Sequence, residues 1–262
     1  MKKYRMLIAY LVISLIVPLG KSFSQSEIND PKVLVNAIGN GDVMQVKQLL
    51  QSGADPNVRH LDYTPLIAAV GATKKIVGQS TSTYRTSRGR MIDGRYVEEE
   101  VIDESSIVHD ETTAEGDVSI EMIQLLLNAG ADVNFKNGPQ GATALHLAAA
   151  TDKRKVVKVL LEAGINIDAQ LVNGETALIL ASSRGFSAVV QDLIDSGADI
   201  DKRTTQGYSA LMYAAMNGFI AVARTLTMAG VDVSVKNNDG LTALSLALNE
   251  GHETIVALLE DL

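Results

Sequence analysis

The stretch Thr143-Ala144-Leu145-His146-Leu147-Ala148-Ala149 returns three more times in altered form, each time 33 residues further on. The later copies are Thr176-Ala177-Leu178-Ile179-Leu180-Ala181, Ser209-Ala210-Leu211-Met212-Tyr213-Ala214-Ala215 and Thr242-Ala243-Leu244-Ser245-Leu246-Ala247. A second phrase keeps the same phase: Leu160-Leu161-Glu162-Ala163-Gly164, Leu193-Ile194-Asp195-Ser196-Gly197 and Thr225-Leu226-Thr227-Met228-Ala229-Gly230. A constant period near 33 residues is typical of a solenoid, in which one supersecondary unit stacks on the next.

The two phrases resemble the Thr-Pro-Leu-His-x-Ala-Ala and Leu-Leu-x-x-Gly-Ala-Asp-x-Asn motifs of the ankyrin repeat. The resemblance implies an all-α solenoid of helix-turn-helix units joined by β-hairpin loops, and a binding scaffold instead of a catalyst. We expect six repeats, near residues 30–58, 59–135, 136–168, 169–201, 202–234 and 235–262.

Helix boundaries follow from local residues. Asp30-Pro31 and Thr64-Pro65 each predict a helix start, because Asp or Thr caps free backbone amides and Pro suits the first helical position. Glycines recur where the second helix of a repeat must end with a positive φ, at Gly164, Gly197 and Gly230.

The histidines and the loop carboxylates have structural explanations. His146 lies at the motif's His position, where the resemblance implies a hydrogen bond to a neighbouring loop, and His252 lies in the family's Gly-His turn. Carboxylates that recur with the repeat favour turn chemistry, because Asp accepts hydrogen bonds from nearby amides: Asp132, Asp168, Asp199, Asp201 and Asp232. No catalytic set, metal site or cofactor is expected.

The second repeat contains an insertion. Its two helices, from Thr64 and from Ser119 to Asn128, are separated by surplus residues 74–117, basic at first and acidic later. Asp93-Gly94 between apolar residues predicts a hairpin, and Val101-Ile102 and Ile107-Val108 could add short strands. Two interpretations stay open, a segment without fixed structure and a hairpin that extends a binding surface.

Residues 1–24 have the three parts of a secretory signal peptide: a basic start, the apolar run Met6 to Val17, and small residues before a cut at Ser24/Gln25. Residues 25–29 are expected to form a polar leader, followed by the repeat domain over 30–262. The signal predicts a periplasmic or secreted protein. The alternative is that Met6 to Val17 remains as a membrane anchor.

The chain has no Cys, no Trp and a net charge of −8. A solenoid core is thin and needs few large rings, which suits this composition. The acidic balance argues against a nucleic-acid partner, and the fold does not rely on disulfides. We expect a monomer whose partner is another protein.

A partner would bind on the concave face, at positions that the scaffold does not need. These positions lie one, three and four residues before the first Thr or Ser of a repeat, and seven and eight residues after it. Glu175, directly before Thr176, holds one of them. Tyr and Arg often carry binding energy. The candidate binding residues are therefore Tyr63, Arg184, Gln206, Tyr208, Met216, Asn217 and Asn249.

The leading hypothesis is a non-catalytic interaction module that binds, masks or scaffolds a partner protein in the bacterial envelope. The alternatives are a membrane-tethered structural adaptor and an inhibitor or immunity protein against a toxin. An enzyme with a site in the insertion is the remaining class.

Overall fold

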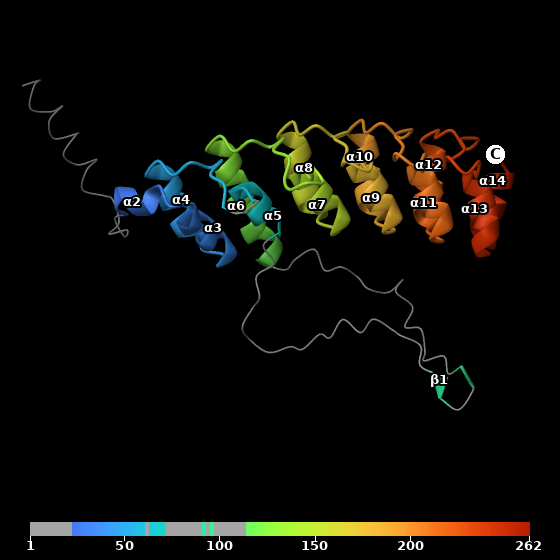
Figure 1. Cartoon of the computed structure of the whole chain (residues 1–262), viewed down its shortest axis with the longest axis horizontal. Helices are drawn as coiled ribbons and strands as arrows, with labels where there is room; N and C mark the ends of the chain where they lie inside the picture. Colours follow the sequence, from blue (N-terminus) through green and yellow to red (C-terminus); the bar gives the residue numbers. More distant parts are fainter. Residues whose placement is uncertain (1–22, 61–62, 72–90, 93–94, 97–113) are drawn as a thin grey trace, which may run out of the picture.

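The computed structural model describes residues 23–60, 63–71, 91–92, 95–96 and 114–262. Helices in this part of the chain form pairs that follow one another along a single stack (Figure 1). The predicted all-α solenoid is confirmed. The pairs are α3 (Pro31–Gly39) with α4 (Val43–Gln51), α5 (Pro65–Gly71) with α6 (Ala114–Asn128), α7 (Ala144–Ala150) with α8 (Arg154–Glu162), α9 (Ala177–Ser183) with α10 (Ser187–Asp195), α11 (Ala210–Met216) with α12 (Ile220–Met228), and α13 (Ala243–Glu250) with α14 (Glu253–Glu260).

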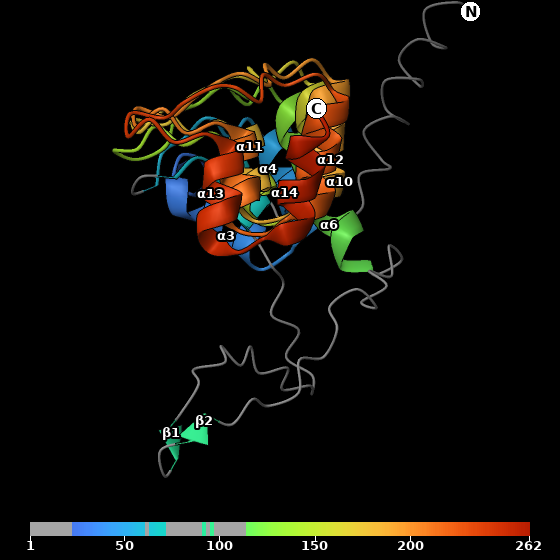
Figure 2. The same ribbon diagram turned by 90° about the vertical axis from the view of Figure 1, so that its right-hand side faces the viewer.

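The stack has two layers of helices. The first helix of each pair packs on the first helix of the next pair, and the second helices pack on one another in the same order. Seen along the stack from its C-terminal end, loops extend beyond the layer that holds α11 and α13 (Figure 2). The surface that the loops and this inner layer form together is called the concave face below.

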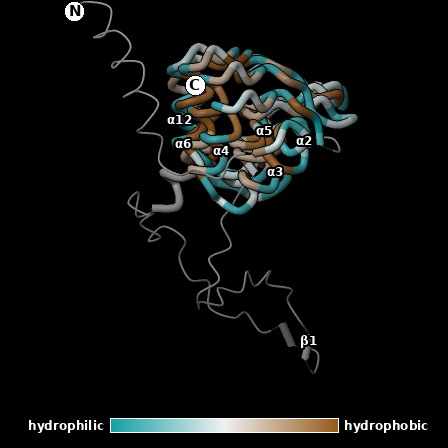
Figure 3. Tube along the Cα trace, turned by 90° about the vertical axis from the view of Figure 1, so that its left-hand side faces the viewer, coloured by the Kyte–Doolittle hydropathy of each residue, from teal (hydrophilic) through white to brown (hydrophobic). Residues whose placement is uncertain are grey.

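The core lies between the layers and between consecutive pairs. It is built from Leu, Val, Ile, Ala and Met side chains. The trace coloured by hydropathy shows stretches of apolar residues along the helices (Figure 3). Leu178 of α9, for example, is only 2% exposed. Each pair buries its apolar surface on its neighbours, which is why the fold needs several consecutive units.

The predicted helix starts and stops are confirmed. Asp30 caps α3 by accepting a hydrogen bond from the Lys32 amide at 2.9 Å, and Pro31 is the first helical residue. The Thr64 hydroxyl accepts from the Ile67 amide at 3.4 Å at the start of α5. The three glycines expected to end helices have positive φ: Gly164 (77°), Gly197 (88°) and Gly230 (84°).

Two expectations about local structure are wrong. Residues 25–29, expected to be a polar leader, contain the short helix α2 (Gln25–Ile28), because Ser24 and Glu27 form a capping box and Ile28 packs against the core. The second helix of the interrupted pair begins at Ala114 and not at Ser119, so the last residues assigned to the insertion belong to α6. Its length of 15 residues exceeds the 9 residues of α8.

The expected hairpin at Asp93-Gly94 agrees with two short strands, β1 (Met91–Ile92) and β2 (Arg95–Tyr96). They pair in antiparallel fashion, with Met91 opposite Tyr96 and Ile92 opposite Arg95. The other expected strands, at 101–102 and 107–108, lie outside the described residues, as does the segment 1–22. Among the helices that the structure does describe, none has the length and apolar character needed to cross a bilayer.

Candidate functional site

Backbone hydrogen bonds fix the loops of the concave face. Within three successive loops the amide of Leu171, Thr204 or Asn237 donates to the carbonyl four residues later, each at 2.9 Å. Between loops, the Val172 amide donates to the Gln140 carbonyl at 3.1 Å, and the Thr205 amide donates to the Asn173 carbonyl at 2.8 Å. The loop edge is therefore one continuous hydrogen-bonded surface that holds its side chains in place before any partner binds.

A second series of hydrogen bonds joins the turns that follow the outer helices. The side-chain oxygens of Asn57, Asn134 and Asp168 accept from amides of the next unit at 2.7, 2.7 and 2.9 Å. Asp201 accepts from the Asp232 amide in the same way at 3.3 Å. Within the turns, Asp132, Asp199 and Asp232 each accept from the amide two residues later, at 2.9, 3.0 and 2.9 Å, which confirms turn chemistry for these carboxylates. Within the described ranges, no group of three or more His, Asp or Glu residues could hold a metal ion.

His146 joins a helix to the neighbouring loop, as the resemblance implies. Its Nδ1 lies 2.8 Å from the Thr143 hydroxyl, and its Nε2 lies 3.3 Å from the Glu175 carbonyl. Burial lowers the pKa of His146 below its usual value, since removal from water disfavours the charged ring. His252 has a matching role, with Nε2 at 3.1 Å from the Met216 carbonyl. Both histidines are structural.

The seven candidate binding residues fall at two levels of the concave face. Tyr63, Gln206 and Tyr208 lie in the loops, directly before the inner helices. Arg184, Met216, Asn217 and Asn249 lie at the opposite ends of those helices. Seven helical residues separate the levels, which corresponds to about 10 Å at 1.5 Å per residue. The structure therefore does not bring the seven together in one site.

Three of the seven also serve the scaffold. The Tyr208 ring is half-buried and lies 5.4 Å from the Tyr213 ring, and the half-buried Met216 packs against the core. The Asn217 side-chain amide donates to the Ser183 carbonyl at 3.3 Å, across to the preceding pair. The other four are exposed, including Tyr63 at 50%. These four side chains are therefore available to contact a partner.

Sequence reasoning missed Tyr213. This residue lies four positions after the capping Ser209, where the preceding units carry Leu147 and Leu180, and all three side chains are half-buried on the inner layer. They form a stripe between the two levels of candidate residues. A Tyr at a position that holds Leu in the two preceding repeats was the available signal, but this position was not among those expected to bind a partner.

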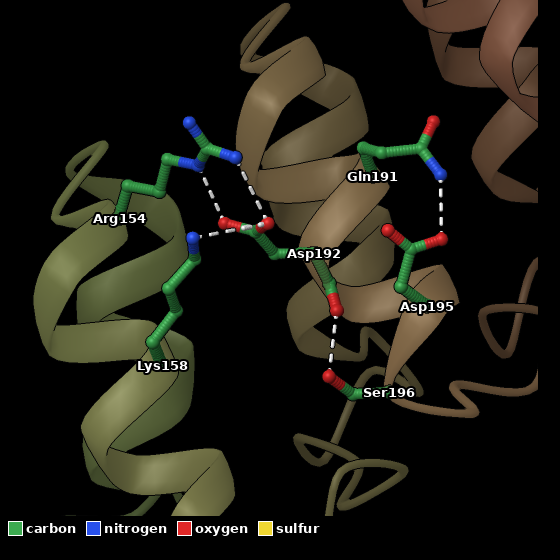
Figure 4. Close-up of polar contacts among 6 residues, drawn as sticks. All are labelled: Arg154, Lys158, Gln191, Asp192, Asp195 and Ser196. Carbon is green, nitrogen blue, oxygen red and sulfur yellow. Dashed lines mark hydrogen bonds and ion pairs between the residues drawn. The ribbon is translucent and has the colours of Figure 1, made fainter.

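The outer layer carries a separate polar cluster between α8 and α10 (Figure 4). Arg154 donates two hydrogen bonds to Asp192, at 2.5 and 3.0 Å, and Lys158 lies 3.7 Å from the same carboxylate. An open groove of about 390 Å³ lies beside it, also lined by Glu162 and Asp195. Both cations are already engaged with Asp192, so this cluster joins consecutive units and contains none of the predicted binding residues.

Residues 112–204 and 185–261 match the model of the family described as ankyrin repeats in three copies. This chain belongs to the ankyrin-repeat family. Ankyrin repeats generally mediate protein–protein interaction. The family match begins at residue 112, so α3, α4 and α5 precede it, and six ankyrin repeats remain a prediction.

One curated protein with a similar segment is the E3 ubiquitin-protein ligase KEG of Arabidopsis thaliana, which is 42% identical over 53 residues. The shared segment is 20% of this ankyrin-repeat chain and 3% of that protein. So small a share does not transfer the ligase activity to this chain.

Proposed function

We propose that this chain is an exported, non-catalytic ankyrin-repeat module of six repeats that binds another protein on its concave face in the bacterial envelope. The observation that supports it best is the half-buried stripe of Leu147, Leu180 and Tyr213, which lies beside loops held by a backbone ladder. An apolar stripe on a rigid edge suits a protein segment better than a small polar substrate. Binding there would mask or scaffold the partner.

Export is proposed from the signal-like residues 1–24. N-terminal sequencing of the protein from its native host tests it. A mature start near Gln25 would support export and exclude the membrane-tethered adaptor, whereas an intact Met1 would contradict cleavage.

Affinity capture from the envelope fraction of the native host tests binding on the concave face. Arg184→Ala removes an exposed concave side chain, and Arg224→Ala on the outer helix α12 is the matched control. We expect one captured protein to be lost or weakened by Arg184→Ala and kept by Arg224→Ala, with both variants folded. Equal capture by the wild type and both variants would contradict a concave site at this level.

A further inference from the structure

On the concave face, Glu175 of one repeat lies beside the repeat that carries Tyr208 and Tyr213. Glu175 and Tyr208 occupy the same position of their repeats, directly before the capping residues Thr176 and Ser209. Tyr213 lies one helical turn into α11. The same position in the flanking repeats holds Ala142 and Leu241, so a carboxylate beside a tyrosine pair is confined to the middle of the stack.

The backbone under this group is fixed. The Glu175 carbonyl accepts from the Leu171 amide at 2.9 Å and lies 3.3 Å from His146 Nε2. The Tyr208 amide donates to the Thr204 hydroxyl at 3.1 Å, and its carbonyl accepts from the Thr204 amide at 2.9 Å. The side chains that a ligand would contact are therefore carried by an ordered backbone, which lowers the entropic cost of binding.

The two rings are tilted by 36° with their centroids 5.4 Å apart, and both are half-buried. Neither hydroxyl makes a hydrogen bond to another described residue. The loops that carry Glu175 and Tyr208 are joined by the Thr205 amide, which donates to the Asn173 carbonyl at 2.8 Å, so the carboxylate and the ring pair lie on adjacent units. Burial, the charge of Glu175 and the neighbouring Tyr208 raise the pKa of the Tyr213 hydroxyl. Ring faces and a carboxylate all attract a cation.

The residue Glu175 is half-buried, and its carboxylate has no cationic partner among the described residues, whose ion pairs involve Asp192 and Asp199. An opposite charge supplied by a ligand would give this carboxylate an ion-pair partner. The whole chain is acidic, at −8, which adds long-range attraction for a basic partner.

We propose that this trio receives a Lys or Arg side chain of the partner protein, with a neighbouring apolar residue of the partner resting on Leu147 and Leu180. The inference rests on the proposed concave binding function and specifies its chemistry. The carboxylate pairs with the cation, and the tyrosine rings cover the apolar stem of the side chain.

Selection of random peptides on phage against the purified full chain tests the inference. Peptides would be selected on the wild type and on Glu175→Gln, with Glu162→Gln on the exposed end of α8 as the matched control. We expect Lys or Arg beside an apolar residue to be enriched on the wild type and on the control, and the basic residue to lose its enrichment on Glu175→Gln.

Affinities of one selected peptide make the test quantitative. Glu175→Gln should weaken binding about ten-fold or more, Tyr213→Leu should weaken it several-fold, and Glu162→Gln should leave it unchanged. Replacing the peptide's basic residue by Met should abolish the effect of Glu175→Gln, because the two changes remove the same contact. Leu at position 213 is the residue type of the two preceding repeats, so this variant is expected to fold.

Peptides that bind the concave face without a basic residue, or equally well to Glu175→Gln, would overturn the inference and leave the proposed function standing. Concave binding would show itself as sensitivity to Tyr63→Ala or Arg184→Ala. If no selected peptide is sensitive to any concave variant, both the inference and the proposed function are contradicted.

Discussion

Replacing Gly218 by Ala should destabilise the stack more than the same change at Gly251. Both glycines follow the inner helix of their repeat, and both have a left-handed backbone, with φ of 78° and 75°. A Cβ atom at Gly218 would lie 2.7 Å from the His252 ring of the next repeat, whereas a Cβ at Gly251 would meet nothing within 4 Å. Comparing the two variants separates the free-energy cost of the left-handed backbone from the cost of the contact between repeats.

The magnitude follows from these two causes. A left-handed conformation costs an Ala residue about 1–2 kcal/mol, and Gly251→Ala should show only this loss. Overpacking typically adds about 1–3 kcal/mol, so Gly218→Ala should lose about 2–5 kcal/mol in total. The His252 ring cannot move away freely, because its Nε2 is held 3.1 Å from the Met216 carbonyl.

Urea unfolding followed by far-UV circular dichroism measures both variants. The double variant Gly218→Ala/His252→Ala should be more stable than the sum of the two single changes predicts, since removal of the ring relieves the clash. Equal destabilisation by Gly218→Ala and Gly251→Ala, without coupling to His252, would refute the contact between the ring and the glycine.

Three further perturbations test the fold. Leu178→Ala should cost about 2–5 kcal/mol, whereas Leu248→Ala, at a side chain that is 56% exposed, should cost less than about 0.5 kcal/mol; equal urea midpoints would mean that the repeat register is wrong. Because the folded state lowers the pKa of His146, the unfolded chain binds the proton first as the pH falls through about 6.5. Stability should therefore decrease from pH 7.5 to 5.5, and less so in His146→Ser; identical pH dependences would contradict a buried neutral ring. Replacing residues 72–119 by the Thr-Asp-Lys turn that joins α7 to α8 should keep cooperative thermal unfolding, because loop length affects stability only weakly; loss of the transition would place the insertion in the core.

Much of the fold was predictable because the same sequence signals occur in several repeats. The caps at Thr64 and Ser209 and the glycines after the outer helices are local signals, and each agrees with the period. The start of α6 was not predictable, because helix 114–128 has no counterpart of its length in the other repeats. A rule derived from the regular units does not apply where one unit departs from them.

The binding face was only partly predictable. The position of a residue within the repeat predicts on average whether it is exposed or belongs to the core. It does not predict whether the side chain contacts other residues of the scaffold. Asn217 donates a hydrogen bond to the Ser183 carbonyl of the preceding repeat, and the Tyr208 ring lies against the Tyr213 ring of its own repeat. Such contacts depend on which residue types lie nearby, in the same repeat or in the adjacent one, and the position within the repeat does not specify them.

The separation of α5 from α6 along the chain has a consequence for the order of folding. Every other helix pair consists of segments that are close in sequence, so its contacts form after a short search. For α5 and α6, residues 72–113 must first be closed into a loop, which costs entropy before any contact forms. Folding should therefore nucleate among the regular units from Thr143 onward and propagate backwards, so that α3, α4 and α5 join last. In pulse-labelling hydrogen exchange, the amides of α9 and α11 should gain protection before those of α3.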